Sequence, residues 1–183
     1  MSGKRRIKLA TVGLKLDLAC GQNKTEGYVG VDIWPGEGVD IVHDLRVRPW
    51  PFADQSVEEV VCNQFFEHLT GEERMGFMDE LWRVMKVDAK AVFVTPYYTS
   101  MRAIQDPTHK WPPIAETSYL YFNKGWRDTN GLSHYPIGCD FDFSFGYLLA
   151  GDVAARNQEY RDNAIRQFNN AVTDLQVTLV RRK

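Results

Sequence analysis

Apolar residues fall into short runs along the first third of the chain, and each run predicts a strand. Four of them lie at residues 14–20, 28–33, 39–43 and 57–63, and turn residues bound each run, as is typical of buried strands. Only residues 21–27 separate the first two runs, whereas a parallel crossover usually takes about a dozen residues or more. We therefore expect the first crossover helix to be shortened to a turn or missing.

A helical period begins at residue 70. Thr70 and Glu73 predict a capping box, in which the threonine side chain accepts the Glu73 amide proton and the glutamate carboxylate reaches back. The apolar residues that follow recur at helical spacing on one face, and they are Met75, Met78, Leu81, Trp82 and Met85. A stripe of this kind is more often core than cofactor site, and we interpret it as core.

The middle of the chain is less regular. Residues 91–95 predict a fifth strand, which Pro96 closes. The segment 97–138 that follows is rich in aromatic residues and long for a loop inside a compact domain, which is typical of a functional segment. We expect a short helix near residues 114–122 and interpret the whole segment as a lid over a binding pocket.

The last third predicts two strands around a helix. Hydrophobic residues alternate with polar ones at 141–149 and again at 175–179, which is the period of a strand with one buried face. Between these runs, Tyr160, Ala164 and Phe168 share one helical face. The whole chain therefore predicts an α/β fold whose sheet is mostly parallel and ends in an antiparallel pair.

Composition narrows the class of protein. The 183 residues suffice for a single domain over residues 1–183, and the 44% hydrophobic and 25% charged content is ordinary for a globular protein. The net charge of -2 argues against coating nucleic acid by charge alone, although basic residues cluster at 4–6 and 181–183. Three cysteines without a C-x-x-C spacing indicate a reducing compartment. Because we find no signal peptide and no membrane span, we expect a cytoplasmic protein.

The most informative motif is Leu-Asp-Leu-Ala-Cys-Gly at residues 16–21, with Asp32 eleven residues after Gly21. A buried strand, a glycine turn and a second strand with an acid at its tip make a nucleoside-binding arrangement. The glycine lets the backbone approach a ligand closely because it has no Cβ. The carboxylate can accept hydrogen bonds from both ribose hydroxyls, although an aspartate at a strand tip is often only a turn residue.

Four segments in order resemble the class I S-adenosylmethionine (SAM)-dependent methyltransferases of the small single-domain type. They lie at residues 16–21, 31–33, 44–69 and 80–96, so that the match covers roughly residues 14–96. The resemblance implies a Rossmann-like doubly wound sheet, SAM as the cofactor and methyl transfer as the activity. Because the sulfonium of SAM is already an activated methyl donor, such an enzyme mainly has to hold the acceptor in line and exclude water.

The resemblance also assigns the cofactor-binding residues, which are Asp17, Ala19, Cys20 and Gly21 at the methionine end, Asp32 and Ile33 at the ribose, Asp44 and Leu45 at the adenine, and Asn63, Gln64 and Phe65 beside the methyl group. Two departures from the family pattern concern turns. The family usually has a second glycine where Ala19 stands, and its Lys-Pro-Gly-Gly turn is Lys-Val-Asp-Ala at residues 86–89. The missing first helix also removes one wall of the usual pocket.

Candidate catalytic residues lie in two places. Asp106 and His109 belong to an Asp-Pro-Thr-His sequence, which is typical of an Asx-type turn. A similar sequence follows the fifth strand in some members of the resembling family, and by that resemblance we predict that Asp106 or His109 orients or deprotonates the acceptor. His68 follows Glu67 at a predicted helix start and either contacts the substrate or is a partly buried structural histidine. Asp106, His109 and His134 have the residue types of a metal triad, but nothing in their spacing demands one, and we predict no metal site.

Three functions stay open, and the one we favour is methyl transfer to an oxygen or nitrogen of a small-molecule, sugar or nucleoside-like acceptor. The alternatives are a nucleic-acid or protein methyltransferase and a non-catalytic SAM-binding module. A nicotinamide oxidoreductase is disfavoured because the G-x-G-x-x-G spacing is absent. Residues of the segment 97–138 would either stack on a planar acceptor or form the core of the lid, and they are Trp111, Tyr119, Tyr121 and Trp126 with Lys110, Lys124 and Arg127. The sequence does not indicate an oligomeric state.

Overall fold

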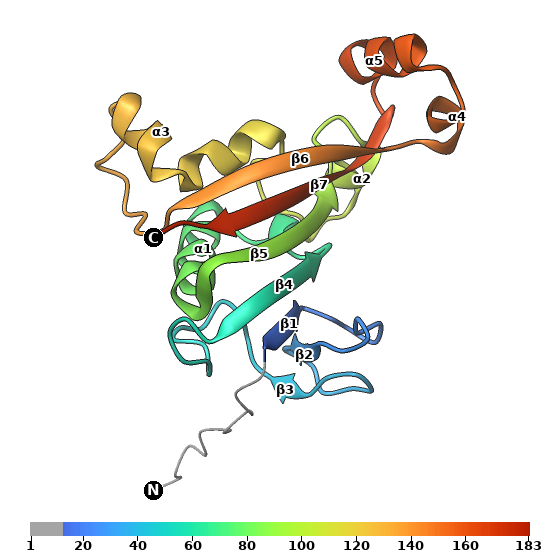
Figure 1. Ribbon diagram of the computed structural model, residues 1–183. Coiled ribbons are helices and arrows are strands. Elements are labelled where there is room, and N and C mark those ends of the chain that lie inside the picture. The colour runs from blue at the N-terminus through green and yellow to red at the C-terminus, as the bar shows by residue number, and fades with distance from the viewer. Residues whose placement is uncertain (1–12) are drawn as a thin grey trace, which may run out of the picture.

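A seven-stranded sheet forms the centre of the molecule (Figure 1). The computed structural model describes residues 13–183; residues 1–12, with the basic cluster at 4–6, lie outside the described residues. The strands are β1 (Leu14–Leu18), β2 (Val29–Asp32), β3 (Ile41–Val42), β4 (Val57–Asn63), β5 (Met85–Pro96), β6 (Phe141–Leu149) and β7 (Val172–Arg181). The helical segments are η1 (Phe66–His68), α1 (Gly71–Val84), α2 (Met101–Gln105), η2 (Glu116–Phe122), α3 (Lys124–Thr129), α4 (Gly151–Ala154) and α5 (Gln158–Gln167).

The sheet is mostly parallel, with the order β3-β2-β1-β4-β5-β7-β6. β1 pairs in parallel with both β2 and β4, and β5 pairs in parallel with β4. β7 pairs antiparallel with both β5 and β6. The predicted Rossmann-like α/β sheet with an antiparallel C-terminal pair is therefore confirmed, and β4 and β6 have the predicted bounds.

The connection between β1 and β2 consists of turns, and no helix lies in it. Asp17, almost fully buried at the end of β1, holds the connection from inside, because its Oδ2 accepts the amide proton of Thr25 at 2.7 Å. The prediction that the first crossover helix is shortened or missing is confirmed. The crossover from β1 to β2 is therefore a loop.

The helices that pack on the sheet lie on one of its faces. Phe93 of β5 is fully buried, and its ring lies 5.6 Å from that of Phe66 and 6.0 Å from that of Phe77 in α1. The side chains of Val61 and Val92, which are register partners on the opposite face, are only half-buried. In Figure 1 the helices α1 and η2 lie behind the strands. Among residues 13–183, one sheet face thus carries the core and the other carries no packed helix.

Helix α1 begins as predicted. Glu73 donates its amide proton to Oγ1 of Thr70 at 3.3 Å, and the Thr70 amide donates to the Glu73 carboxylate at 2.8 Å. Met78 and Leu81 are fully buried, which confirms the core interpretation of the apolar face. The prediction that Met85 belongs to this face is wrong, because the backbone turns extended there and Met85 begins β5, six residues before the predicted start of that strand at residue 91.

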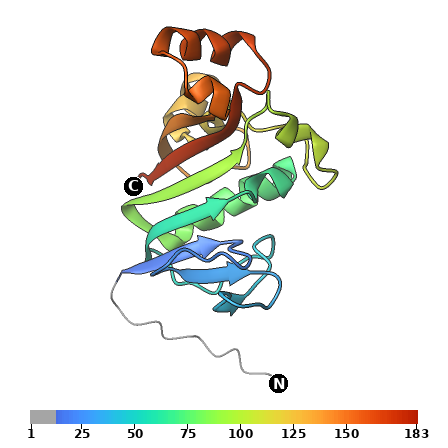
Figure 2. The ribbon, with the colours of Figure 1, turned by 90° about the vertical axis from the view of Figure 1, so that its right-hand side faces the viewer.

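The C-terminal helix differs from its prediction. Tyr160 is 41% exposed and Phe168 is 50% exposed, whereas Ala164 alone of the predicted face is buried, against Val153 and Ala171. Figure 2 shows the reason, since the orange-red helices α4 and α5 lie beyond the end of the sheet, away from the main core, and share only the small cluster around Ala164. The short helix expected near residues 114–122 is present as η2, whereas α2, α3 and α4 were not predicted. None of the helices in residues 13–183 is long and apolar enough to cross a bilayer.

Candidate functional site

A pocket of about 220 Å³ opens where β1, β2 and β4 end. Open α/β sheets bind ligands at the carboxyl ends of their strands. The loops after these strands and after β3 supply the lining residues, which are Ala19, Asp32, Ile33, His43, Asp44, Leu45, Arg46, Phe65, His68 and Leu69. The pocket therefore collects all four residues predicted for the ribose and the adenine, together with one predicted catalytic histidine.

Asp32 presents a fixed carboxylate at the tip of β2. Its Oδ2 accepts the amide proton of Gly21 at 3.0 Å, and its Oδ1 accepts that of Trp34 at 3.0 Å. Each carboxylate oxygen has a second lone pair. Asp32 can therefore accept two further hydrogen bonds from a ligand in the pocket.

The turn after β1 brings the backbone close to this carboxylate. Ala19 and Gly21 both adopt left-handed backbone conformations, with φ angles of 57° and 53°. Cys20 between them is buried, and burial together with the charges of Asp17 and Asp32 raises the pKa of its thiol to about 11. Cys20 is therefore a neutral thiol at physiological pH and serves the turn rather than nucleophilic chemistry.

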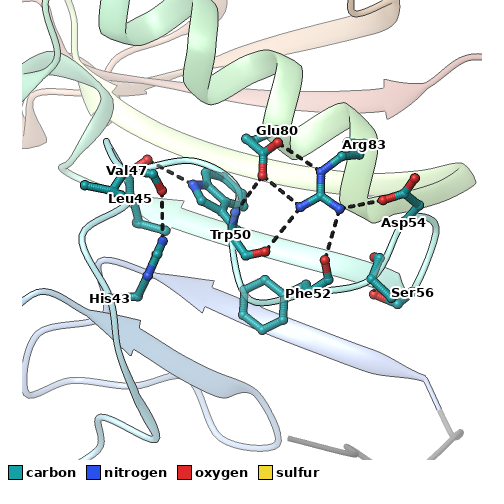
Figure 3. A network of polar contacts seen from close by, with 10 residues as sticks. His43, Leu45, Val47, Trp50, Phe52, Asp54, Ser56, Glu80 and Arg83 are labelled. Carbon is teal, nitrogen blue, oxygen red and sulfur yellow. Dashed lines mark hydrogen bonds and ion pairs between the residues drawn. The ribbon is translucent and has the colours of Figure 1, made fainter. Parts of the chain in front are cut away.

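A polar network fixes the segment that follows β3 (Figure 3). Trp50 donates from Nε1 to the carbonyl oxygen of Leu45 at 2.9 Å and from its amide to Glu80 at 2.7 Å. Arg83 donates to Glu80 at 2.8 Å and to Asp54 at 2.6 Å. Burial opposes the charge of Glu80, but the hydrogen bonds from Arg83 and Trp50 prevail and lower the pKa of its carboxyl. Helix α1 thus holds in place the loop that carries Leu45 and its neighbours Asp44 and Arg46, which also line the pocket.

Asp44 is already paired within the protein. Arg46 donates from Nε to Oδ1 and from Nη2 to Oδ2, both at 2.9 Å, and its amide donates to Oδ1 at 3.0 Å. The side-chain hydrogen bonds from Arg46 lower the pKa of Asp44, although burial opposes them. A ligand at the adenine position would meet this ion pair rather than a free carboxylate, which the sequence pattern did not indicate.

Gln64 is turned away from the pocket. Its Nε2 donates to Oδ1 of Asp174 in β7 at 3.0 Å, and Arg102 donates to Oδ2 of the same carboxylate at 2.8 Å. The predicted cofactor residues that do not line the pocket are Asp17, Cys20, Gly21, Asn63 and Gln64. Among these, Gly21 lies at the pocket edge through its bond to Asp32, and the exposed Asn63 ends β4.

The predicted catalytic residues come together through a chain of hydrogen bonds. Thr108 Oγ1 lies 2.6 Å from Oδ1 of Asp106 and 2.9 Å from Nδ1 of His68. The hydroxyl has a single proton, which it donates to the carboxylate, so it accepts from His68 Nδ1–H. Neutral His68 therefore keeps an unshared electron pair on Nε2. Burial and the nearby His109 lower the pKa of His68, which favours this neutral form.

His109 lies against His68 with the ring centroids 4.7 Å apart. Its Nδ1 is 3.1 Å from the carbonyl oxygen of Ala103, and because a carbonyl only accepts, this nitrogen carries the proton. Like His68, neutral His109 has its lone pair on Nε2. The loop is held to η1 by the amide of Lys110, which donates to the Glu67 carbonyl at 2.9 Å.

Arg74 secures the same loop from α1. Its buried guanidinium donates to the carbonyl oxygens of Pro112 at 2.7 Å, Phe66 at 3.2 Å and Lys110 at 3.3 Å. These bonds join η1 and the loop after α2 into one unit. The positions of the two histidines are therefore set by buried contacts.

Glu67 is the residue that sequence reasoning undervalued. It is only 4% exposed, and both of its carboxylate oxygens lack a hydrogen-bond partner. Burial raises the pKa of Glu67 to about 7. One ligand atom each from Glu67, His68 and His109 lie within 4.8 Å of one another. The signal in the sequence is the adjacent Glu-His pair, which by itself indicates only a helix start.

The structure does not assemble the triad of Asp106, His109 and His134 that the residue types allowed. In residues 13–183, the group with ligand atoms at metal-binding separation is Glu67, His68 and His109. His134 is exposed and contacts Tyr135 instead.

The aromatic and basic residues of the segment 97–138 divide between two roles. Tyr119 is buried and stacks on Phe66, and the buried Arg127 donates to the carbonyl oxygens of Tyr121 and Cys139. These residues form the core of the segment. Trp111 is 83% exposed and remains available to a ligand.

Comparisons with known proteins agree with this geometry. Residues 16–93 match the family model described as a methyltransferase domain. The chain is similar to a SAM-dependent methyltransferase from Archaeoglobus fulgidus, with 21% identity, a TM-score of 0.61, and 92% of this chain and 86% of that chain covered. It is similar to one from Mesorhizobium loti, with 16% identity, a TM-score of 0.52 and coverages of 96% and 95%. The YcgJ protein from Bacillus subtilis has the same fold, with 13% identity, a TM-score of 0.53 and coverages of 96% and 94%. No curated protein matches the chain in sequence.

Proposed function

We propose that the chain is a class I S-adenosylmethionine-dependent methyltransferase and that it methylates an oxygen or nitrogen atom of a small-molecule, sugar or nucleoside-like acceptor. The family match and the fold support SAM-dependent methyl transfer. The choice of acceptor class is supported by the net charge of -2, which does not favour a polyanionic acceptor such as nucleic acid.

The observation that carries the proposal is the carboxylate of Asp32 at the pocket. Two backbone amides orient it, and each oxygen retains a lone pair for a ribose hydroxyl. Ile33 and Leu45 line the same pocket and offer apolar surface to an adenine ring. These residues suit the nucleoside part of SAM, and we assign them to it.

Methyl transfer from SAM requires the protein mainly to position the reactants. When bound, SAM supplies a methyl group on a positively charged sulfur. In the net reaction an S–CH₃ bond is replaced by an O–CH₃ or N–CH₃ bond, and the acceptor releases one proton. The residues of this chain then have to hold the acceptor in line, exclude water and provide a path for that proton.

We place the acceptor next to His68, which lines the pocket and is a neighbour of the proposed donor site. Thr108 and Asp106 orient its ring, so that the unshared pair on Nε2 is available on the acceptor side. The exposed Trp111 follows the same loop and offers a surface on which a planar acceptor can stack.

Calorimetric titration tests the donor site. Wild-type protein should bind SAM and its demethylated product S-adenosylhomocysteine with micromolar affinity. Asp32→Ala removes two charge-assisted hydrogen bonds and should weaken both affinities by about 100-fold or more. Asp152→Ala, in the exposed helix α4, is the matched control and should bind like the wild type. Equal affinity in the wild type and Asp32→Ala would remove the basis of the proposal.

A screen for methyl transfer then identifies the acceptor class. Hydroxyl- and amine-bearing metabolites, nucleosides, RNA fragments and peptides are incubated with labelled SAM and analysed by mass spectrometry. Methylation of a small molecule or nucleoside supports the proposal. Methylation confined to RNA or to peptides would overturn the proposed acceptor class while leaving the donor site intact. SAM binding without transfer to any acceptor would point to a binding module.

A further inference from the structure

The side chains of Glu67, His68 and His109 converge beside the proposed donor site. Each offers one ligand atom, and these atoms lie within 4.8 Å of one another. Two imidazoles and a carboxylate form a donor set that first-row divalent cations bind, and catalytic zinc sites commonly have three protein ligands with a further position open.

The Glu67 carboxylate points to a missing partner. The residue is 4% exposed, yet neither of its oxygens has a hydrogen-bond partner in the structure. A buried carboxylate without partners carries a large desolvation cost. The positive charge of Arg74 acts on Glu67, but the guanidinium donates its hydrogen bonds to backbone carbonyl oxygens and not to the Glu67 carboxylate. A cation bound by Glu67 would supply the missing interaction.

Both histidines have the tautomer that a metal ligand needs. Nδ1 of His109 donates to the carbonyl oxygen of Ala103, and Nδ1 of His68 donates to Thr108, which in turn donates to Asp106. Metal-binding histidines usually donate their second nitrogen to a carbonyl or a carboxylate-linked group in this way, which leaves the other nitrogen unprotonated and able to coordinate. His68 and His109 both have this hydrogen-bond pattern, and their rings are in contact. Nε2 of His109 lies 3.8 Å from Oδ2 of Asp106, which is beyond hydrogen-bond distance.

The backbone around the three residues is fixed before any ion binds. The Lys110 amide donates to the Glu67 carbonyl, and Arg74 holds the carbonyl oxygens of Phe66, Lys110 and Pro112. The loop that carries His109 is therefore bound to the segment that carries Glu67 and His68. A preorganised ligand set of this kind loses little conformational entropy when it binds a cation.

We propose that Glu67, His68 and His109 bind a divalent first-row cation, with Zn²⁺ as the reference ion, and that the hydroxyl oxygen of the acceptor takes an open coordination position. The second part rests on the proposed function and narrows it to an O-methyltransferase. Coordination lowers the pKa of a hydroxyl, so the acceptor releases its proton to solvent as an alkoxide or phenoxide forms. That oxygen then attacks the methyl carbon: the O–CH₃ bond forms, the S–CH₃ bond breaks, and S-adenosylhomocysteine leaves with the electron pair. The site departs from the sequence-based expectation that the protein binds no metal.

Metal titration without SAM or acceptor tests the site directly. Chelator-treated wild-type protein is titrated with Co²⁺, followed by its visible absorption, and Zn²⁺ affinity is measured by competition. We expect one ion per chain. His109→Ala and Glu67→Gln should each weaken Zn²⁺ binding by at least about 100-fold, because a ligand atom is lost. His134→Ala, an exposed histidine outside the group, is the matched control and should not change the affinity.

Two further measurements keep the test decisive. X-ray absorption on the zinc-loaded wild type needs no variant and should report two imidazole ligands; sulfur ligands, or fewer than two imidazoles, would overturn the site. SAM titration of the same samples separates the two ideas. SAM binding without metal binding by the wild type would disprove this inference alone, whereas metal binding without SAM binding would disprove the proposed function and the acceptor step that rests on it, and would leave the metal site intact. Unchanged Zn²⁺ affinity in a folded His109→Ala variant also overturns the site.

Discussion

The hydroxyl of Thr108 lies 2.9 Å from Nδ1 of His68, although forty residues separate the two in the chain. This contact joins the loop after α2 to the segment that follows β4. It assigns the proton of His68 to Nδ1, because the threonine proton goes to Asp106. Thr108, to which the sequence motifs assign no role, thus orients the side chain of His68 in the pocket.

Replacement of Thr108 should separate orientation from cofactor binding. Thr108→Val keeps the volume of the side chain and removes the acceptor for His68 Nδ1–H. We expect kcat for methyl transfer to fall by about 10- to 100-fold and the KM for SAM to stay unchanged. Steady-state kinetics measures both. Thr108→Ser, which restores the hydroxyl, should recover most of the activity, and Thr117→Val, an exposed threonine in η2, should have no effect. A proportional rise of KM for SAM in Thr108→Val would speak for a structural role.

Arg74 should make a large contribution to stability. Arg74→Met fills the same space but leaves the carbonyl oxygens of Phe66, Lys110 and Pro112 without their donor. We expect the free energy of unfolding to fall by about 3 kcal/mol, as for other losses of buried charged hydrogen bonds. Urea denaturation measures the change, with the exposed Arg156→Met as the control. A loss below about 1 kcal/mol would show that the loop does not depend on these bonds.

Glu80 should stabilise the fold in a pH-dependent way. Hydrogen bonds from Arg83 and Trp50 outweigh burial and lower its pKa in the folded protein. A carboxyl with a depressed folded pKa contributes stability that is present above its unfolded pKa, and that contribution is lost as the pH falls through the folded pKa. Glu80→Gln should therefore cost about 2 kcal/mol at pH 7.

The pH dependence is the sharper part of that test. The difference in unfolding free energy between wild type and Glu80→Gln should begin to narrow as the pH drops below about 4, where the unfolded chain takes up the proton, and should vanish below the lowered folded pKa of Glu80, where both side chains are neutral. Chemical denaturation at several pH values measures it, with Glu72→Gln, an exposed residue of the same helix, as the control. A difference that stays constant with pH would exclude the charge of Glu80 as its origin.

Ala19 should gain from replacement by glycine. Its φ of 57° is left-handed, a region in which a Cβ costs about 1 kcal/mol or more, and part of this gain is offset by the greater freedom of glycine in the unfolded chain. We expect Ala19→Gly to raise the unfolding free energy by about 0.5 kcal/mol and to leave SAM affinity within about threefold of the wild type. Differential scanning calorimetry and SAM titration check both. A loss of stability in Ala19→Gly would contradict the assigned strain.

The parts of the fold that short-range pattern controls could be predicted from the sequence. The alternating run at β6 and the capping box of Thr70 and Glu73 depend on neighbours a few residues away, and both are present. The Tyr160 and Phe168 face of α5 was mispredicted because helical spacing does not reveal whether a core is available to pack against.

The same distinction between short-range pattern and long-range contact applies to the candidate site. Asp32 could be predicted because a strand and a turn of fixed length place it. The pairing of Asp44 with Arg46 and the turn of Gln64 toward Asp174 are choices between available partners, which spacing does not determine. The meeting of Glu67 and His109 depends on a loop contact across the fold, and no local pattern reports such a contact.

The loop between β1 and β2 has a kinetic consequence. A helix in this connection would have to shift as a unit to let a bound nucleoside leave, whereas the loop is held by individual bonds such as those of Asp17 to Thr25, Asp32 to Gly21 and Lys24 to Asp40. Segments held by few buried contacts open at low free-energy cost, and loops move within nanoseconds to microseconds. Opening of this loop should therefore not be the step that limits the exchange of spent cofactor for fresh cofactor.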